Sequence, residues 1–276
     1  MGYTRRNRIE IFKERIAPIQ INYLGFPGTT CIPNLDFLIA DKYVIPRKYK
    51  KFYSENVIYM PNSYINSVKY EYSNSEVVSK KKDLPPNAFL LAAFHNTLKL
   101  SVEVIKCWIG ILKQSENTYL WLKEPNKITK KNLLSYFHSY HIDLSRIVFA
   151  ERVDNYNEHV SRYSQADLFL DTFNYNGHST LVECVWSELP FITLSGESFA
   201  SRVGTSILNS LGLQELITYS EDEYIEKVLF FIENVDQLLI IKDKIKRQKK
   251  DGDFFNQNLF VKQLERKFIE LRNSFK

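Results

Sequence analysis

From residue 87 onward, short apolar runs alternate at least five times with segments that carry apolar residues at helical spacing. The first run, AFLLAAF (88–94), is continuously apolar, which is typical of a strand buried on both faces. The segment that follows it, 101–114, repeats its apolar residues with the period of a helix, and Ser101 is placed to cap it. Such alternation predicts an α/β protein, a Rossmann-like doubly wound parallel sheet with helices on both faces.

The other elements continue this pattern. Expected strands are 118–124, 146–153, 166–172, 190–196 and 215–220, and expected helices are 128–142, 156–165, a segment from about 179, 198–213 and 260–275. The first third is less regular, with short expected strands at 19–24, 36–41 and 56–60. Residues 61–86 carry Pro, Asn, Ser and Lys, which indicates a loop or linker.

Parallel strands joined by right-handed crossovers end on one edge of the sheet, and ligands bind there. The polar stretch FNYNGHST (173–180) follows one of these strands and opens a helix. Gly177 permits a left-handed conformation and a close backbone approach, while His178, Ser179 and Thr180 offer polar groups beside unpaired helix N–H groups. This composition suits a phosphate or pyrophosphate. Taken alone, it fits an ordinary Ser- or Thr-capped helix slightly better.

Three more polar residues should face the same edge. Lys99 follows the first buried strand, although a lone lysine usually serves solubility. His159 lies near the start of a short helix, where a ligand contact and a structural role are equally plausible. Glu183 lies one helical turn after Ser179 and could hold a ribose diol, although glutamate is also a common helix former.

Several classes of protein are disfavoured. GxGxxG, GxxxxGK[ST] and GxSxG motifs are missing, as are Cys/His pairs with zinc spacing. We therefore expect no metal and no cofactor, and a nucleoside diphosphate ligand fits better than hydrolase chemistry. The net charge of +5 comes mainly from 47–51, 79–83 and 242–251, which we interpret as solvated faces rather than a nucleic-acid site.

The compartment is inferred from two further features. No apolar run reaches the roughly 18 residues of a transmembrane helix, so we expect no membrane association. The three cysteines are widely spaced and odd in number, which indicates thiols in a reducing environment. We expect a cytoplasmic protein.

Four segments, in matching order and spacing, resemble the protein O-linked N-acetylglucosamine (O-GlcNAc) transferase family. They are NYLGFPGTT (22–30), YSENVIYMPNSY (53–64), DLFLDTFNYNGHST (167–180) and ITLSGESFASRV (192–203). The resemblance runs from about residue 2 to the C-terminus. It implies a GT-B fold, a UDP-sugar donor, and inverting transfer of N-acetylglucosamine to Ser or Thr hydroxyls of a protein acceptor.

The resemblance also assigns residues by motif position. Lys99 matches the lysine that contacts the diphosphate and stabilises the departing UDP, and Asn96 falls where the family has Gln near the uracil. His159 matches a nucleotide-pocket histidine, and Glu183 falls where the family commonly has Asp on the ribose. The phosphate cradle corresponds to His178, Ser179 and Thr180, and the loop that closes over the sugar corresponds to Gly25, Pro27, Gly28 and Thr29.

The chain begins part-way through the family's catalytic region. We therefore interpret residues 1–86 as the tail of the N-terminal catalytic lobe with a linker, 87–250 as the Rossmann-like UDP-sugar-binding lobe, and 251–276 as a helix packed back across the lobes. The N-terminal lobe that carries the proposed catalytic histidines is expected to be missing. Two alternatives stay open: a non-catalytic UDP-binding or interaction fragment, and a related glycosyltransferase with another sugar or acceptor.

Overall fold

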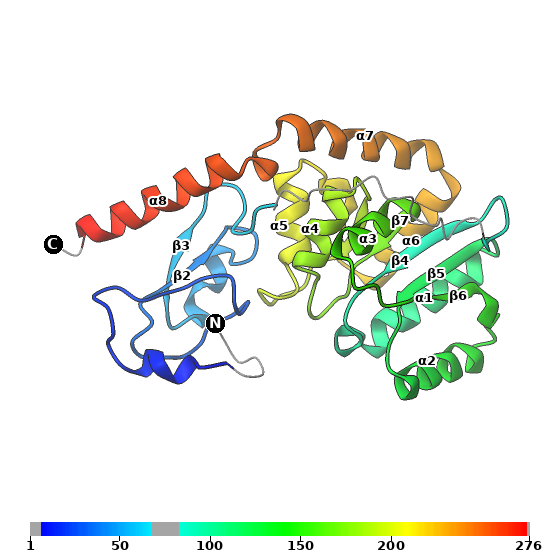
Figure 1. Ribbon diagram of the computed structural model, residues 1–276, viewed down its shortest axis with the longest axis horizontal. Coiled ribbons are helices and arrows are strands. Elements are labelled where there is room, and N and C mark those ends of the chain that lie inside the picture. Colours follow the sequence, from blue (N-terminus) through cyan, green and yellow to red (C-terminus); the bar gives the residue numbers. More distant parts are fainter. Residues whose placement is uncertain (1–6, 68–82, 275–276) are drawn as a thin grey trace.

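The structure, a computed structural model, describes residues 7–67 and 83–274, which form two parallel sheets with their helices (Figure 1). Residues 68–82 of the expected linker lie outside the described residues. The larger sheet has six parallel strands, in the order β6 (Ile147–Ala150), β5 (Thr118–Lys123), β4 (Phe89–Ala93), β7 (Leu168–Leu170), β8 (Phe191–Leu194) and β9 (Ile217–Thr218). The chain starts in the middle at β4, builds outward to β6, returns to β7 and builds outward again. The neighbours β4 and β7 therefore form the topological switch point.

Helices connect and cover the strands of the two sheets. They are α1 (Val102–Gln114), α2 (Lys127–Ser139), α3 (Tyr156–Ser161), α4 (Ser179–Trp186), α5 (Val203–Ser210), α6 (Glu221–Glu233), α7 (Val235–Asp251) and α8 (Gln257–Ser274). Because the chain builds in opposite directions from the switch point, right-handed crossovers place α1 and α4 on opposite faces. The expected cap of α1 is confirmed, since the Ser101 hydroxyl accepts a hydrogen bond from the Val104 N–H.

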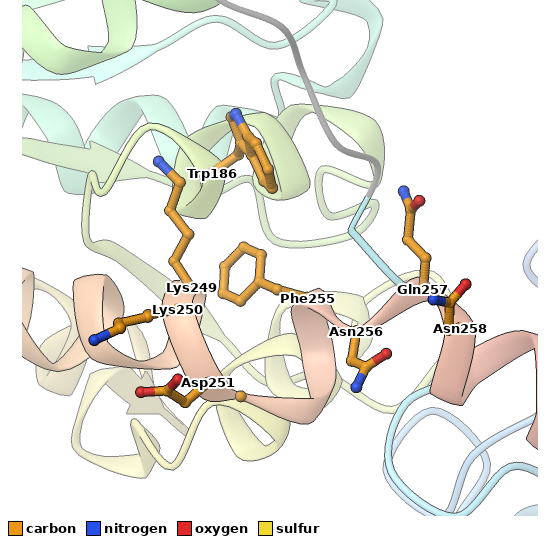
Figure 2. Close-up of a pocket in the computed structure, with 9 residues that line it drawn as sticks. Trp186, Lys249, Lys250, Asp251, Phe255, Asn256, Gln257 and Asn258 are labelled. Carbon is orange, nitrogen blue, oxygen red and sulfur yellow. The ribbon is translucent and has the colours of Figure 1, made fainter.

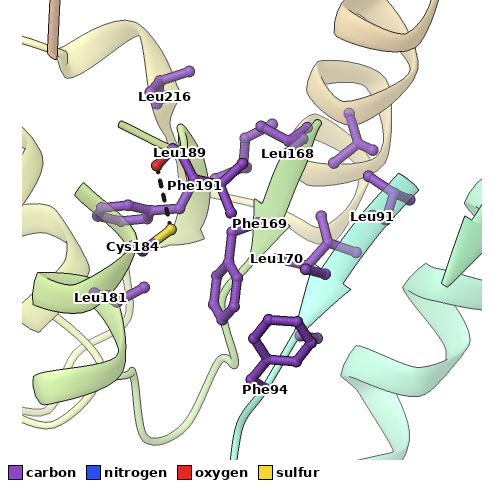
Figure 3. Close-up of a cluster of buried hydrophobic side chains, with 14 of the residues drawn as sticks. Leu91, Phe94, Leu168, Phe169, Leu170, Leu181, Cys184, Leu189, Phe191 and Leu216 are labelled. Atoms are coloured by element: carbon purple, nitrogen blue, oxygen red, sulfur yellow. Dashed lines mark hydrogen bonds between the residues drawn. The ribbon is translucent and has the colours of Figure 1, made fainter. Parts of the chain in front are cut away.

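The centre of the larger sheet is an apolar core. Phe169 of β7 is fully buried, and in Figure 3 its side chain lies between Leu181 of α4 and Phe94, which follows β4. The thiol of Cys184 donates to the Leu189 carbonyl, 3.2 Å away. Cys184 is thus one of the buried small side chains that the apolar face of α4 predicted.

One expected helix starts later than its sequence pattern indicated. The segment 198–213 becomes helical only at Val203, because the hydroxyls of Ser198 and Ser201 bond to each other and to nearby backbone groups. Such local bonds compete with helix formation. The helix ends at Ser210, two residues before the expected stop at Gly212, whose φ of 68° suits a glycine.

The smaller sheet holds β1 (Ile21–Asn22), β2 (Phe37–Ala40) and β3 (Asn56–Tyr59), all parallel. The helix α8 lies over it (Figure 1), with Phe260, Leu264 and Leu271 packed against a cluster that includes Ile39 and Ile58. In the described part of the chain, no helix is long and apolar enough to cross a bilayer.

Two side chains, Arg202 directly before α5 and Ser206 within it, form hydrogen bonds with the loop after β2. The Ser206 hydroxyl donates to the Asp41 carboxylate at 2.6 Å. Arg202 donates through Nε and Nη2 to the Val44 carbonyl, at 3.0 and 2.7 Å, and its guanidinium lies over the ring of Tyr49. These contacts fix the smaller sheet relative to the larger one.

Candidate functional site

The loops after β4 and β7 meet at the switch point. The Lys99 ammonium donates to the carbonyl oxygen of Asn176 at 2.8 Å and lies 4.4 Å from the centre of the Tyr175 ring. Burial lowers the pKa of Lys99, and the nearby Asp171 carboxylate acts in the opposite direction. Lys99 therefore lies between the loops that follow β4 and β7, on the edge where its place after the first strand predicted it.

Asp171 organises the loop that follows β7. Its Oδ1 accepts hydrogen bonds from the N–H groups of Thr172 and Gly177, at 2.9 and 2.8 Å, and its Oδ2 accepts one from the Thr193 hydroxyl at 2.7 Å. Burial raises the pKa of Asp171 to about 7 in spite of these bonds. The sequence analysis did not identify Asp171 as a site residue. Its position, a carboxylate at the end of an apolar strand, could have indicated that role.

His95 was also missed. Its Nε2 lies 3.0 Å from the Leu170 carbonyl oxygen and 3.6 Å from Oδ1 of Asp171. Burial, helped by the Lys99 charge, lowers the pKa of His95 to about 3, so the ring is neutral and the contact with Asp171 is not an ion pair. A carbonyl only accepts, so Nε2 carries the proton and donates to Leu170.

Gly177 is required here by packing. A Cβ on this residue would lie 2.8 Å from Leu181 Cγ and 3.1 Å from His95 Cε1. Gly177 does not adopt the left-handed conformation that a glycine permits, since Gly212 alone among the described glycines has a positive φ. The glycine lets the loop pass close to the first turn of α4.

The helix α4 begins at Ser179 with His178 in the N-cap position. The His178 side chain makes no capping hydrogen bond within the described residues; its Nδ1 lies 3.3 Å from the Asn176 carbonyl. Burial and the Lys99 charge lower the pKa of His178 to about 4, so this ring is neutral too. Ser179 is exposed and Thr180 half-buried. The start of α4 therefore offers N–H donors beside an ammonium group, which suits an anion.

A cavity of about 540 Å³ lies beside the switch point, at the carboxyl ends of β5 and β6. Its lining residues are Phe94, Lys123, Glu124, Ala150, Glu151, Arg152, Val153, Asp154, Tyr156, His159 and Arg162. His159 thus lies on the expected edge. Asn96 is exposed, and its side chain accepts from the Leu98 N–H, so it caps a short turn outside the cavity lining.

Glu183 lies behind the cavity wall. Its Oε1 accepts from the Tyr156 hydroxyl at 2.6 Å, and its Oε2 accepts from the Tyr163 hydroxyl at 2.9 Å and lies 3.6 Å from His159 Nε2. Burial opposes ionisation, but hydrogen bonds from His159, Tyr156 and Tyr163 together hold the pKa of Glu183 below its usual value. Both carboxylate oxygens are thus already bonded to the protein.

The loop expected to close over the sugar belongs to the smaller sheet. It comprises Gly25, Pro27, Gly28 and Thr29, and follows β1. The Thr29 hydroxyl donates to Glu55 at 2.7 Å, which ties the loop to the start of β3.

A second cavity, of about 480 Å³, lies where α7 meets α8 (Figure 2). Lys249 covers the ring of Trp186 and pairs with Glu188 at 3.1 Å. Asn256 caps the first turn of α8 through the Leu259 N–H. The Lys249 contacts thus join α7 to the end of α4, while Asn256 caps α8. No group of three potential metal ligands occurs in residues 7–67 or 83–274.

Two parallel sheets, the larger with its topological switch point between β4 and β7, define the fold of GT-B glycosyltransferases. The sequence profile of glycosyl transferase family 41 matches residues 1–70 and 68–264. The chain belongs to glycosyl transferase family 41, and this confirms the resemblance inferred from the four sequence motifs.

Curated relatives and a solved structure agree with this assignment. An Arabidopsis thaliana protein named "Probable UDP-N-acetylglucosamine--peptide N-acetylglucosaminyltransferase SEC" is 33% identical over 281 residues, 99% of this chain and 28% of the relative. A Solanum lycopersicum protein named "Probable UDP-N-acetylglucosamine--peptide N-acetylglucosaminyltransferase SPINDLY" is 28% identical over 94% of this chain and 28% of its own length. The chain therefore spans about 28% of the length of these relatives. An O-GlcNAc transferase mutant from Thermobaculum terrenum has the same fold, with a TM-score of 0.85 and 22% identity over 95% of this chain and 49% of that one.

Proposed function

We propose that this chain is the donor-binding region of a protein glycosyltransferase that moves N-acetylglucosamine from UDP-N-acetylglucosamine to Ser or Thr hydroxyls, with inversion at the anomeric carbon. The observation that carries the proposal is the Lys99 ammonium held at the switch point by the Asn176 carbonyl, beside the start of α4. The names of the curated relatives support both the donor and the peptide acceptor.

We assign to Lys99 and to the start of α4 the stabilisation of the leaving group, UDP. When the acceptor oxygen attacks the anomeric carbon, the bond to UDP breaks and negative charge grows on the diphosphate. The Lys99 ammonium and the N–H groups at Ser179 and Thr180 are positioned to balance that charge. The proton of the acceptor hydroxyl is accepted by the donor's own phosphate or by a group of a partner lobe outside this chain.

The cavity beside the switch point suits the nucleoside. A diphosphate at Lys99 and α4 would place uridine over the carboxyl ends of β5 and β6, where the cavity of about 540 Å³ opens. Aromatic side chains of Phe94 and Tyr156 and the ring of His159 line it. Flat apolar surfaces with a few polar groups are typical of nucleoside sites.

Calorimetric titration of the chain with UDP tests the donor site. We expect saturable binding, and no heat of binding at millimolar UDP would refute the proposal. Transfer of radiolabelled N-acetylglucosamine to a Ser-rich peptide then tests turnover, and we expect the isolated chain to transfer poorly or not at all. Binding with no transfer even after a partner lobe is added would favour the alternative, a non-catalytic UDP-binding module.

A further inference from the structure

The ammonium group of Lys99 contacts two consecutive residues of the loop after β7. Its Nζ donates to the Asn176 carbonyl oxygen at 2.8 Å and lies 4.4 Å from the centre of the Tyr175 ring. The carbonyl accounts for one of the N–H groups of the ammonium, and the ring turns the negative face of its π electrons toward the same charge. The position of the ammonium therefore depends on an aromatic side chain as well as on a hydrogen bond.

The loop that carries Tyr175 is held by hydrogen bonds on both sides of that residue. The Thr172 hydroxyl donates to the Tyr175 carbonyl at 2.7 Å, and the Asn176 side chain donates to the Thr172 carbonyl at 2.6 Å. The Asn176 N–H donates to the Ala200 carbonyl at 2.9 Å. The Tyr175 ring has a second aromatic neighbour at the start of α4, the His178 ring, with 5.4 Å between the ring centres. This fixed backbone confines the Tyr175 ring to a small region beside the ammonium.

The contact between Lys99 and Tyr175 differs from other lysine–ring contacts of the chain. Lys42, Lys48 and Lys51 are exposed, and each lies over the ring of the very next residue. Lys99 is half-buried, and the ring beside it belongs to a loop far away in the chain. Attraction between a cation and a ring grows as water is excluded, so this pair should contribute more than the exposed ones.

We infer that Tyr175 is a positioning residue whose ring holds the Lys99 ammonium in place for the diphosphate, and so sets how strongly the site prefers a nucleoside diphosphate to the bare nucleoside. The inference rests on the proposed function and deepens it. Because the carbonyl and the ring occupy two directions around Nζ, the remaining N–H bonds are confined to few orientations. A group held in this way loses little freedom when it meets an anion, which favours binding.

Two substitutions separate the ring of Tyr175 from its hydroxyl. Tyr175→Leu removes the ring and keeps an apolar side chain, whereas Tyr175→Phe keeps the ring. Calorimetry would measure the affinity of each variant and of the unmodified chain for UDP directly, and for uridine by competition with UDP. Thermal melting monitored by circular dichroism would confirm that each variant is folded.

The chain also supplies a matched control. The Tyr140 ring lies 5.5 Å from the ammonium of Lys113, at the C-terminal ends of α2 and α1. These helix ends lead into the starts of the next strands, so this pair lies at the edge of the sheet opposite the proposed donor site. Tyr140→Leu therefore removes a similar contact that has no part in the proposed site.

We expect Tyr175→Leu to bind UDP about 3- to 10-fold more weakly than the unmodified chain, which is the effect of one partly desolvated contact between a cation and a ring. Its affinity for uridine should stay within about twofold, because uridine has no phosphate for Lys99 to meet. Tyr175→Phe should keep the UDP affinity within about twofold, since the aromatic face remains. Tyr140→Leu should leave both affinities unchanged.

A double-mutant cycle tests whether Tyr175 acts through Lys99. In a Lys99→Met background the cation is gone, so adding Tyr175→Leu should change the UDP affinity by less than about twofold. The same loss with and without Lys99 would overturn the inference, because it would indicate a general effect on the loop.

Other outcomes separate the inference from the proposed function. If the unmodified chain binds UDP but Tyr175→Leu binds it equally well or more tightly, the Tyr175 inference is overturned while the donor site stands. Equal losses for UDP and uridine, or equal losses in Tyr175→Leu and Tyr175→Phe, would also overturn it. If the unmodified chain binds no UDP, the proposed function fails, and the inference fails with it.

Discussion

The Lys99 ammonium lies 2.8 Å from the carbonyl oxygen of Asn176, although 77 positions separate the two residues in the chain. The bond joins the loops that follow β4 and β7, the two neighbouring strands at which the direction of sheet building reverses. It leaves an ammonium group at the point where doubly wound sheets bind their ligands. The predictions below test this site and the packing that holds it.

Replacing Lys99 with alanine should weaken UDP binding by about 1–3 kcal/mol, because a charge-assisted hydrogen bond to the diphosphate is lost. Calorimetry at fixed ionic strength measures the change. Lys106→Ala is the control, since Lys106 is exposed on α1. Equal UDP affinity in Lys99→Ala and the unmodified chain would place the diphosphate elsewhere.

Gly204→Ala should destabilise the fold by about 1–3 kcal/mol through overpacking. The added Cβ would lie 2.8 Å from Thr193 Cβ and 2.9 Å from Asp171 Oδ2, so it would disturb the hydrogen bond between these residues. Gly110→Ala in α1 is the matched control, because its Cβ would only touch Ile225 Cδ1 at 3.4 Å and alanine favours a helix. Urea unfolding measures both, and similar stabilities would contradict this account of the Asp171 site.

His178→Gln should change how stability depends on pH. The fold holds the pKa of His178 at about 4, against 6.5 for an ordinary histidine, because burial disfavours the charged ring. Between these pH values the His178 ring is protonated in the unfolded chain but neutral in the folded one, so protons favour unfolding. The contribution of His178 to the free energy of unfolding is therefore complete above pH 6.5 and is lost as the pH falls toward 4. The difference in unfolding free energy between unmodified chain and variant should shift by about 1–3 kcal/mol over this range.

Urea denaturation at several pH values measures this difference. His138→Gln, at an exposed position on α2, is the control and should leave the pH dependence unchanged. A pH profile of His178→Gln parallel to that of the unmodified chain would show that the ring is not held neutral.

Ser206→Ala should loosen the connection between the two sheets. The Ser206 hydroxyl donates to the buried Asp41 carboxylate, and its loss removes a donor where burial already raises the pKa of that group. We expect a loss of about 1–3 kcal/mol in unfolding free energy. Ser210→Ala on the same helix is the control, since the Ser210 hydroxyl donates only to the Ile207 carbonyl within α5 among the described contacts. Equal stabilities for the two variants would show that the Asp41 contact contributes little.

The local patterns of the sequence predicted most of the elements. Continuous apolar runs marked strands such as β4, the helical period marked α1, and Ser101 marked its start. These features depend on neighbours within a few residues, which is why the sequence alone sufficed. The placement of Lys99, His159 and the start of α4 on one edge followed from the same alternation, because parallel strands all end on the same side.

The start of α5 shows where local reasoning was insufficient. The apolar pattern of 198–213 was compatible with a longer helix, but the hydroxyl of Ser201 bonds to Ser198 instead. Gly177 is a second example. A glycine is needed there because Leu181 and His95 leave no room for a Cβ, and not because of its own backbone angles.

The sequence by itself determined the class of fold and the set of polar loops on the ligand edge. Only the tertiary structure decided which of those loops meet, because the strand order brings β7 beside β4 and so joins Asn176 to Lys99. It also decided that Asp171 and His95 lie buried at the centre of the site and that Glu183 is enclosed by Tyr156 and Tyr163. Burial and hydrogen-bond partners come from residues far apart in the chain, and only the complete packing specifies them.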